Sequence, residues 1–253
     1  MVPGSMPRIL TAAMRADDTL APVRLSILLL ASGRGTRLRS EVPKAFVAVR
    51  GVPLVLRSAR RLAQIADDFE LLLAVHPEDR ERHLAPVLGE LDRAGLTAIV
   101  DGGETRQDSM RRALRASDPA RELVVVHDAA RPFFPLPQAR LCCARALEVG
   151  AALLAIPAPD TLKLVDHGKV DRTFDRSRVW LAQTPQVIRR DRLLAALAHA
   201  DATGFAGTDD VSLCEHAAQP VAVVEGDRRN LKITTPEDLV LAEGIATAED
   251  GAR

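Results

Sequence analysis

The chain has 253 residues, of which 47% are hydrophobic and 27% are charged. These proportions are ordinary for a globular protein and exclude a disordered, collagen-like or low-complexity chain. Lysine plus arginine and aspartate plus glutamate each number 34, so the net charge is zero and the basic excess of a general nucleic-acid-binding protein is absent. No apolar run of the sequence approaches the roughly 18 residues that a membrane-spanning helix needs. Neither a nucleic acid nor a membrane is therefore an expected partner.

The cysteines and the first residues of the chain indicate where the protein resides. Three cysteines, of which Cys142 and Cys143 are adjacent, have the spacing of neither a disulfide framework nor a zinc site. A reducing, cytoplasmic location is expected. Residues 1–23 carry two acidic residues where a signal peptide would need an unbroken apolar segment. We predict that residues 1–23 form a flexible N-terminal tail.

Short apolar runs alternate with segments of helical periodicity. The runs are nearly continuous in Val, Ile and Leu, which favours strands covered on both faces, as in a mostly parallel sheet. Helices are predicted after Pro53, at Gln138–Val149 before Gly150, and after the capping residue Thr235. This alternation predicts an α/β fold. The predicted strands are Leu25–Leu30, Glu70–Val75, Thr97–Val100, Glu122–Val126, Ala151–Ile156 and Val221–Val224.

One segment interrupts this alternation. Thr161–Val165 and Lys169–Phe174 flank a turn that contains Gly168, a pattern that predicts a β-hairpin. Because an isolated hairpin is marginally stable in water, we expect it to pack on another element or on a second subunit. Thr184-Pro185-Gln186 further on is expected to be a loop. The sequence contains no internal repeat and no domain-splitting linker. Residues 24–246 are therefore expected to form one domain with a β-arm at about 159–179, and residues 247–253 a C-terminal tail.

The first predicted strand leads directly into a glycine-containing loop. The loop reads Ala31-Ser32-Gly33-Arg34-Gly35-Thr36-Arg37-Leu38 and is followed by Pro43-Lys44. Glycines at the carboxyl end of a strand let the backbone approach a phosphate group. The dinucleotide motif needs a glycine at Leu38, and the Gly-Lys-Ser/Thr of a P-loop is absent. Two cations on such a loop suit a triphosphate whose pyrophosphate leaves, although a plain turn with two solvated cations explains the pattern equally well.

Two further segments carry candidate site residues. Asp128 follows a central strand, where a carboxylate can hold Mg²⁺ against phosphate oxygens, or can simply cap a turn. His127 beside it is expected to be a satisfied histidine at the strand end. Gly102 and Gly103 form a turn that enters a helix, and the turn's N–H groups together with Ser109 could contact a base edge or a phosphate. A plain turn with a helix cap explains these glycines as well.

Taken in order, these segments resemble the 2-C-methyl-D-erythritol 4-phosphate cytidylyltransferase family, nucleotidyltransferases of the non-mevalonate isoprenoid pathway. The resemblance covers roughly Ser26–Gly244. The family commonly has Pro-Ala-Ala-Gly where this chain has Leu30-Ala31-Ser32-Gly33. The segments that carry the resemblance are Gly33-x-Gly35-x-Arg37-x₅-Pro43-Lys44, Asp101-Gly102-Gly103 with Arg106 and Ser109, Val126-His127-Asp128-Ala129-Ala130-Arg131-Pro132, Asp160-Thr161-x-Lys163, Thr184-Pro185-Gln186, Thr208-Asp209-Asp210 and Lys232-Ile233-Thr234.

The resemblance implies a Rossmann-like, mostly parallel twisted sheet with helices on both faces, and a homodimer formed through the β-arm. It also implies transfer of CMP from CTP to 2-C-methyl-D-erythritol 4-phosphate with release of pyrophosphate, with Mg²⁺ or another divalent cation held at Asp128. The implied catalytic residues are Arg37, Lys44, Arg176 and Lys232. The implied CTP-binding residues are Ala31, Ser32, Gly33, Gly35, Thr36, Arg37, Lys44, Gly103, Glu104, Ser109, Asp128, Ala129 and Lys232. The implied polyol-phosphate-binding residues are Asp128, Arg131, Thr161, Arg176, Thr184 and Lys232, with Thr161 and Arg176 supplied by the other subunit.

Several alternatives stay open at this point. A ribitol 5-phosphate cytidylyltransferase would share the fold and the chemistry, because polyol choice depends on a few pocket contacts. A uridylyl- or guanylyltransferase would share the first loop, but not the His127–Pro132 and Thr184–Gln186 segments in this form. An NAD-dependent oxidoreductase would need a third loop glycine and an acid after the second strand. A non-catalytic nucleotide-binding module would have no use for Lys44, Asp128 and Lys232 together.

Overall fold

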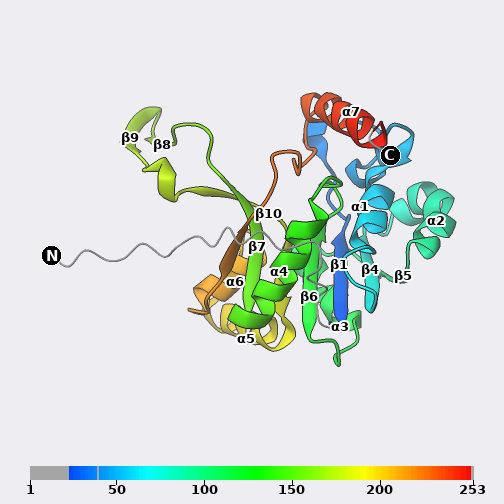
Figure 1. Cartoon of the computed structure of the whole chain (residues 1–253), viewed down its shortest axis with the longest axis horizontal. Helices are drawn as coiled ribbons and strands as arrows, with labels where there is room; N and C mark the ends of the chain where they lie inside the picture. The colour runs from blue at the N-terminus through cyan, green and yellow to red at the C-terminus, as the bar shows by residue number, and fades with distance from the viewer. Residues whose placement is uncertain (1–22, 39, 252–253) are drawn as a thin grey trace.

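A seven-stranded sheet is the centre of the molecule in the computed structural model, which describes residues 23–38 and 40–251 (Figure 1). Within these residues the strand order is β11-β7-β10-β6-β1-β4-β5. Strand β10 runs antiparallel to β6 and β7, and the other neighbours are parallel. The predicted mostly parallel sheet is confirmed. The strands are β1 (Leu25–Leu30), β4 (Phe69–Val75), β5 (Leu96–Asp101), β6 (Leu123–Asp128), β7 (Ala151–Pro157), β10 (Trp180–Arg189) and β11 (Ala222–Glu225).

Helices cover both faces of the sheet, as the apolar strands predict. Alternate side chains of β1 belong to two separate cores: Leu29 packs with residues of α1, α2 and α4, whereas Leu28 packs with residues of α3, α5 and α6. A third, smaller core joins α7 to Leu38 and Ile233. The helices are α1 (Leu54–Leu62), α2 (Leu88–Arg93), α3 (Arg106–Ala116), α4 (Leu136–Val149), α5 (Arg190–Thr203), α6 (Val211–His216) and α7 (Pro236–Asp250).

Local sequence signals fix several helix ends. Gly150 ends α4 at a φ of 112°, a conformation that favours glycine. Thr235 caps α7 in a reciprocal capping box with Asp238, and Pro236 occupies the first turn. Both ends were predicted from the sequence. The remaining short elements are β2 (Ala48–Val49), β3 (Val52–Pro53), a single π-helical turn (Arg80–Leu84) and 3₁₀ turns at Thr36–Leu38, Lys44–Phe46, Ala85–Val87 and Arg176–Arg178.

The expectation of a loop at Thr184-Pro185-Gln186 was wrong. These residues belong to β10, which pairs with β7 on either side of a register shift between Ala182 and Gln186. Proline cannot donate to a ladder of hydrogen bonds, so it indicates a loop when the sequence is considered alone. A bulge tolerates it, because the extra residues of a bulge are unpaired. The bulge also presents the Thr184 side chain toward the end of β6.

The predicted hairpin forms and extends away from the body of the molecule (Figure 1). Its strands β8 (Lys163–Asp166) and β9 (Lys169–Thr173) pair with each other in a sheet of their own. Residues 163–178 are all exposed. No other element among the described residues therefore covers the β-arm.

The structure adjusts the expected ends of the domain. Val23, expected in the N-terminal tail, is buried in the larger core, and residues 1–22 lie outside the described residues. Helix α7 continues through Gly244 to Asp250, so residues 247–250, expected in the C-terminal tail, are helical. Residues 252–253 also lie outside the description. No helix in the described part of the chain is long and apolar enough to cross a membrane.

Candidate active site at the carboxyl ends of β1 and β6

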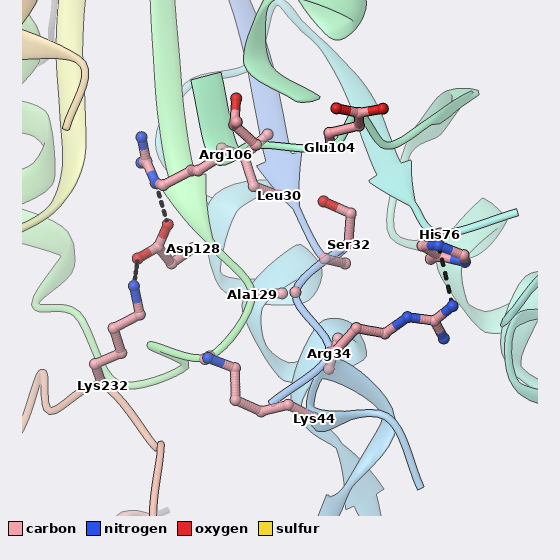
Figure 2. Close-up of a pocket in the computed structure, with 16 residues that line it drawn as sticks. Leu30, Ser32, Arg34, Lys44, His76, Glu104, Arg106, Asp128, Ala129 and Lys232 are labelled. Carbon is pink, nitrogen blue, oxygen red and sulfur yellow. Dashed lines mark hydrogen bonds and ion pairs between the residues drawn. The ribbon is translucent and has the colours of Figure 1, made fainter. Parts of the chain in front are cut away.

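A cavity of about 360 Å³ opens where β1 and β6 end (Figure 2). This is the edge of an α/β sheet at which ligands characteristically bind, because the loops that follow neighbouring strands meet there. It brings together segments that are far apart in the sequence. The cavity is lined by Leu30, Ala31, Ser32, Gly33, Arg34, Lys44, Ala45, His76, Gly103, Glu104, Thr105, Arg106, Asp128, Ala129, Ala130 and Lys232.

The glycine-containing loop after β1 forms one wall and brings Lys44 into the cavity. Gly35 has a φ of +65°, and a Cβ on it would lie 2.5 Å from the Cβ of Lys44, so only glycine permits this close approach. Lys44 begins the turn Lys44–Phe46 and faces the same space as Asp128 and Lys232 (Figure 2). Burial, together with the neighbouring charge of Lys232, lowers the pKa of Lys44 to about 8. An anionic ligand would relieve this repulsion.

Asp128 is held between two cations. Its Oδ1 accepts a hydrogen bond from Arg106 Nε at 3.0 Å, and its Oδ2 lies 2.7 Å from Lys232 Nζ. Burial by itself would raise the pKa of Asp128, but Arg106 and Lys232 outweigh it and hold the pKa well below its usual range. Asp128 is therefore ionised near neutral pH.

Arg106 is a charged residue of the site to which sequence reasoning assigned no role. It stands in the first turn of α3, directly after the N-cap Thr105, where the helix dipole disfavours a cation. That position was a usable signal, because an arginine there needs compensating anions. Two carboxylates supply them: Asp128 at Nε, and Asp210 at Nη1 and Nη2 over distances of 2.8 and 2.7 Å.

The turn between β5 and α3 forms the opposite wall. Gly103 donates its N–H to Ser109 Oγ at 3.0 Å, and a Cβ on Gly103 would lie 2.2 Å from the Cβ of Asp108. The Ser109 hydroxyl also lies 2.8 Å from the hydroxyl of Ser32, the residue that replaces the family's usual alanine. Ser109 is buried and supports the cavity wall behind Gly103 and Glu104, which do line the cavity.

A second cavity of about 240 Å³ shares Arg106, Asp128 and Lys232 with the first. Arg131, predicted to bind the polyol phosphate, lines it and donates to the carbonyl oxygen of Asn230 at 2.8 Å. Burial lowers the pKa of Arg131, and its Nε is buried without a hydrogen-bond partner. The remaining lining residues, most of which the sequence did not assign, are Ala182, Gln183, Thr184, Gln186, Thr208 and Asp209.

Thr184 connects this second cavity to a buried histidine. Its hydroxyl accepts from the backbone N–H of Asp128 at 3.2 Å and lies 3.0 Å from His127 Nδ1. His127 Nε2 lies 3.0 Å from the carbonyl oxygen of Arg131, so it carries the ring proton and Nδ1 accepts from Thr184. Burial lowers the pKa of His127 to about 3. The expectation of a satisfied strand-end histidine is confirmed.

Several predicted site residues do not line either cavity. Arg37 is exposed on the turn Thr36–Leu38. The arginine of this loop that lines the cavity is instead Arg34, which points toward His76 (Figure 2). Arg34 also pairs with Glu78. Arg176 and Thr161 lie on the exposed β-arm, where Arg176 Nη1 contacts the carbonyl oxygen of Pro159 at 3.3 Å. These arm residues therefore do not reach the cavities of their own chain. Gly35 also lies outside both linings, and Thr36 begins the turn that carries Arg37.

The carboxylates at the site suit a magnesium ion that is bound largely by the phosphate groups of a ligand. Among the described residues, no group of three or more histidine, cysteine, aspartate or glutamate side chains is arranged to hold a metal. Asp128 and Glu104 are the carboxylates that line the first cavity. Mg²⁺ commonly binds one or two carboxylates and completes its octahedron with phosphate oxygens and water. The donor set therefore fits Mg²⁺ only together with a phosphate-bearing ligand.

Comparisons with known proteins agree with this geometry. Residues 25–248 match the family model of 2-C-methyl-D-erythritol 4-phosphate cytidylyltransferase. The chain is 37% identical, over 226 residues, to the protein of that name from Bacillus pumilus, which covers 89% of this chain and 98% of the relative. It is 39% identical over 222 residues to the protein of that name from Syntrophus aciditrophicus, covering 87% of this chain and 95% of the relative.

Solved structures agree as well. The crystal structure of 2-C-methyl-D-erythritol 4-phosphate cytidylyltransferase from Thermus thermophilus superimposes with a TM-score of 0.73 at 34% identity and covers 89% of this chain and 100% of that one. The 4-diphosphocytidyl-2C-methyl-D-erythritol synthase structure from Anaerococcus prevotii has a TM-score of 0.76 at 28% identity, with 89% and 97% covered. With the cavity, its cations and these relatives in agreement, the chain belongs to the 2-C-methyl-D-erythritol 4-phosphate cytidylyltransferase family.

Proposed function

We propose that this protein transfers CMP from CTP to 2-C-methyl-D-erythritol 4-phosphate and releases pyrophosphate. One observation carries the proposal: two adjoining cavities share Asp128 and Lys232, and cations line both of them. A nucleoside triphosphate fits the first cavity, beside the glycine loop and Lys44. A phosphorylated polyol fits the second, beside Arg131 and Thr184. The two phosphorus centres then meet at the shared residues.

The reaction needs no general base from the protein. A phosphate monoester is already anionic near neutral pH and can attack the α-phosphorus of CTP in line. His127, the neighbour of Asp128, is fully buried with both ring nitrogens occupied. His76 lines the first cavity, but its ring nitrogens contact Arg34 and the backbone N–H of Glu78. Positioning and charge neutralisation therefore supply the catalysis, as is usual for transfer at phosphorus.

Each cation has a separate task. Lys44 contacts the CTP phosphates and offsets the charge that develops on the leaving pyrophosphate. Lys232 donates to a phosphate oxygen when the substrates bind while it stays paired with Asp128, because an ammonium group has three N–H donors. Asp128 also keeps Arg106 as a partner. A magnesium ion held by Asp128 and phosphate oxygens would supply further charge neutralisation at the α-phosphorus. Gly103, Glu104 and Ser32 line the side of the cavity where the base and ribose would lie. Arg37 would join the phosphates only after the exposed turn Thr36–Leu38 moves.

We also propose a homodimer in which each β-arm packs on the other subunit. Support comes from the exposed apolar side chains of the arm, Val165 and Val170, which are 56% and 60% exposed. Thr161 and Arg176 would then reach the polyol phosphate of the partner subunit. The three cysteines are free and buried, which supports a cytoplasmic location.

Pyrophosphate release with CTP and Mg²⁺ tests the proposed function. We expect turnover with 2-C-methyl-D-erythritol 4-phosphate and little with ribitol 5-phosphate. The matched control is the Lys44→Ala variant, which removes one charge from the first cavity. Turnover with ribitol 5-phosphate alone would keep the mechanism but contradict the substrate. Absence of turnover with both polyols, in a folded protein that still binds CTP, would contradict the proposal.

A further inference from the structure

Asp210 lies behind the shared wall of the two cavities. Its side chain is 1% exposed and belongs to the lining of neither cavity. Both carboxylate oxygens are engaged by Arg106, at 2.8 Å from Nη1 and 2.7 Å from Nη2. Asp210 therefore cannot touch a substrate directly, and any effect it has on the reaction passes through Arg106.

The bidentate pair determines which part of Arg106 faces the active site. A guanidinium group is planar and presents its N–H donors in a rigid fork. With Nη1 and Nη2 bound by Asp210, Nε is the donor that meets Asp128 Oδ1, at 3.0 Å. Without Asp210, the same side chain could rotate its Nη groups toward Asp128 or toward a phosphate.

Asp210 is itself held in place. Its backbone N–H donates to Gln186 Oε1 at 2.9 Å, the N–H of Val211 donates to the same oxygen at 3.0 Å, and Gln186 Nε2 donates to Asp209 Oδ2 at 2.8 Å. Gln186 belongs to β10, so the central sheet anchors the segment before α6. Rigid support of this kind is what keeps a catalytic group in its productive geometry.

We propose that Asp210 is a positioning residue of the cytidylyl transfer. It holds Arg106 so that Arg106 fixes Asp128, and Asp128 in turn places Lys232 at the junction of the two cavities. The ordered chain is Gln186, Asp210, Arg106, Asp128 and Lys232. This inference rests on the proposed function. Arg106, Asp128 and Lys232 line both cavities, whereas the glycine loop and Lys44 line only the first. We therefore expect the positioning to act more on the polyol phosphate and on the chemical step than on CTP binding.

The test compares Asp210→Asn with a matched control, Asp201→Asn, whose arginine partner lies on α3 as Arg106 does. Asn keeps the shape of Asp but offers one acceptor oxygen, so the bidentate pair is lost. Arg111 of α3 makes a bidentate pair with Asp201 at 2.9 and 2.6 Å, and the Asp201 side chain is 62% exposed. Asp201→Asn therefore removes the same kind of pair away from both cavities.

A double variant guards against misfolding. Asp210→Asn alone leaves the buried charge of Arg106 short of a partner, which can destabilise the fold. Arg106→Gln combined with Asp210→Asn leaves neither side chain charged and still removes the positioning. For every variant, kcat and both KM values are measured, together with the Kd of CTP and of 2-C-methyl-D-erythritol 4-phosphate by calorimetry and the Tm.

For Asp210→Asn and the double variant we expect kcat to fall by about ten-fold to a hundred-fold and the KM of the polyol phosphate to rise several-fold. The Kd of CTP should change by about two-fold or less, and Asp201→Asn should match the wild type in every measurement. Wild-type kcat and KM values in Asp210→Asn would overturn the positioning role. So would a loss of CTP affinity and Tm without any selective effect on the polyol phosphate.

The proposed function can fail independently of this inference. A wild-type protein that does not turn over 2-C-methyl-D-erythritol 4-phosphate contradicts the proposed function. The calorimetric Kd of the polyol phosphate then decides the role of Asp210: selective weakening in Asp210→Asn supports positioning, and an unchanged Kd overturns it.

Discussion

Two regions of the molecule differ in burial and in their contacts with the rest of the chain. One is the strand-end cluster, formed by Lys44, Arg106, Asp128 and Lys232, and the other is the β-arm. In the cluster, Asp128 and its partners are joined by short, partly or fully buried ion pairs that involve several elements of the fold. In the β-arm, residues 163–178 are exposed and the two strands pair only with each other. The cluster forms within one chain, whereas the described part of that chain leaves the arm uncovered.

This difference separates two kinds of predicted site residue. Lys44, Asp128 and Lys232 were assigned from the sequence and meet at one cavity of a single chain. Thr161 and Arg176 were assigned from the same family resemblance, yet their own chain keeps them on the exposed arm. If these two residues act, they act on a second subunit. The predictions below test whether the cluster and the arm differ in this way.

The largest effect is expected inside the cluster. Lys44→Ala removes a partly desolvated cation beside the leaving pyrophosphate, so kcat should fall by about 10²–10³-fold. Steady-state pyrophosphate release measures it. Lys44→Arg keeps the charge and should retain more activity than the alanine variant. A fall in kcat of less than about ten-fold for Lys44→Ala would show that Lys44 is not a catalytic residue.

The arm should act on the other subunit. Arg176→Ala is expected to raise the KM of the polyol phosphate by about ten-fold or more, with a smaller change for CTP. Mixing Lys44→Ala and Arg176→Ala subunits should then restore up to about a quarter of wild-type activity, because half of the dimers form one intact site. No recovery after subunit exchange would show that Arg176 acts on its own chain or not at all.

The dimer itself should depend on the apolar surface of the arm. Val165→Asp with Val170→Asp places two carboxylates where a partner would bury apolar side chains, so the dimer dissociation constant should rise by about a hundred-fold or more. Sedimentation velocity measures it. Val240→Asp is the matched control, because Val240 is 73% exposed on α7, away from the arm. A dimer that survives the arm substitutions would place the interface elsewhere.

A pH dependence is expected that belongs to the cluster alone. Because the pKa of Lys44 is about 8 in the free protein, Lys44 is charged below that pH and loses its charge above it. The kcat/KM for CTP should therefore fall about ten-fold per pH unit above pH 8 or so. Bound phosphates stabilise the charged lysine, so kcat should fall only at higher pH. In the Lys44→Arg variant, kcat/KM for CTP should no longer fall above pH 8 or so. An unchanged fall in that variant would show that another group titrates.

Local sequence signals were sufficient for most of the fold. Continuous apolar runs such as Leu25–Leu30 form buried parallel strands, because a strand covered on both faces carries apolar side chains on both. Strand β10 was not predicted, because Pro185 interrupts the pattern of a strand. The strand forms nevertheless, because a bulge accommodates the proline. Its antiparallel pairing depends on β6 and β7, which lie far away in the sequence, so no local signal could reveal it.

The sequence by itself determined the α/β class, the helix ends at Gly150 and Thr235, and the family, because local conformational preferences and ordered motifs are properties of the chain alone. It also marked Lys44, Asp128 and Lys232. Only the tertiary structure decided that Arg106 pairs with Asp128 and Asp210, that Thr184 bonds to His127, and that the arm stays away from its own cavities. Ion pairs and burial depend on distances between segments that the chain brings together only on folding.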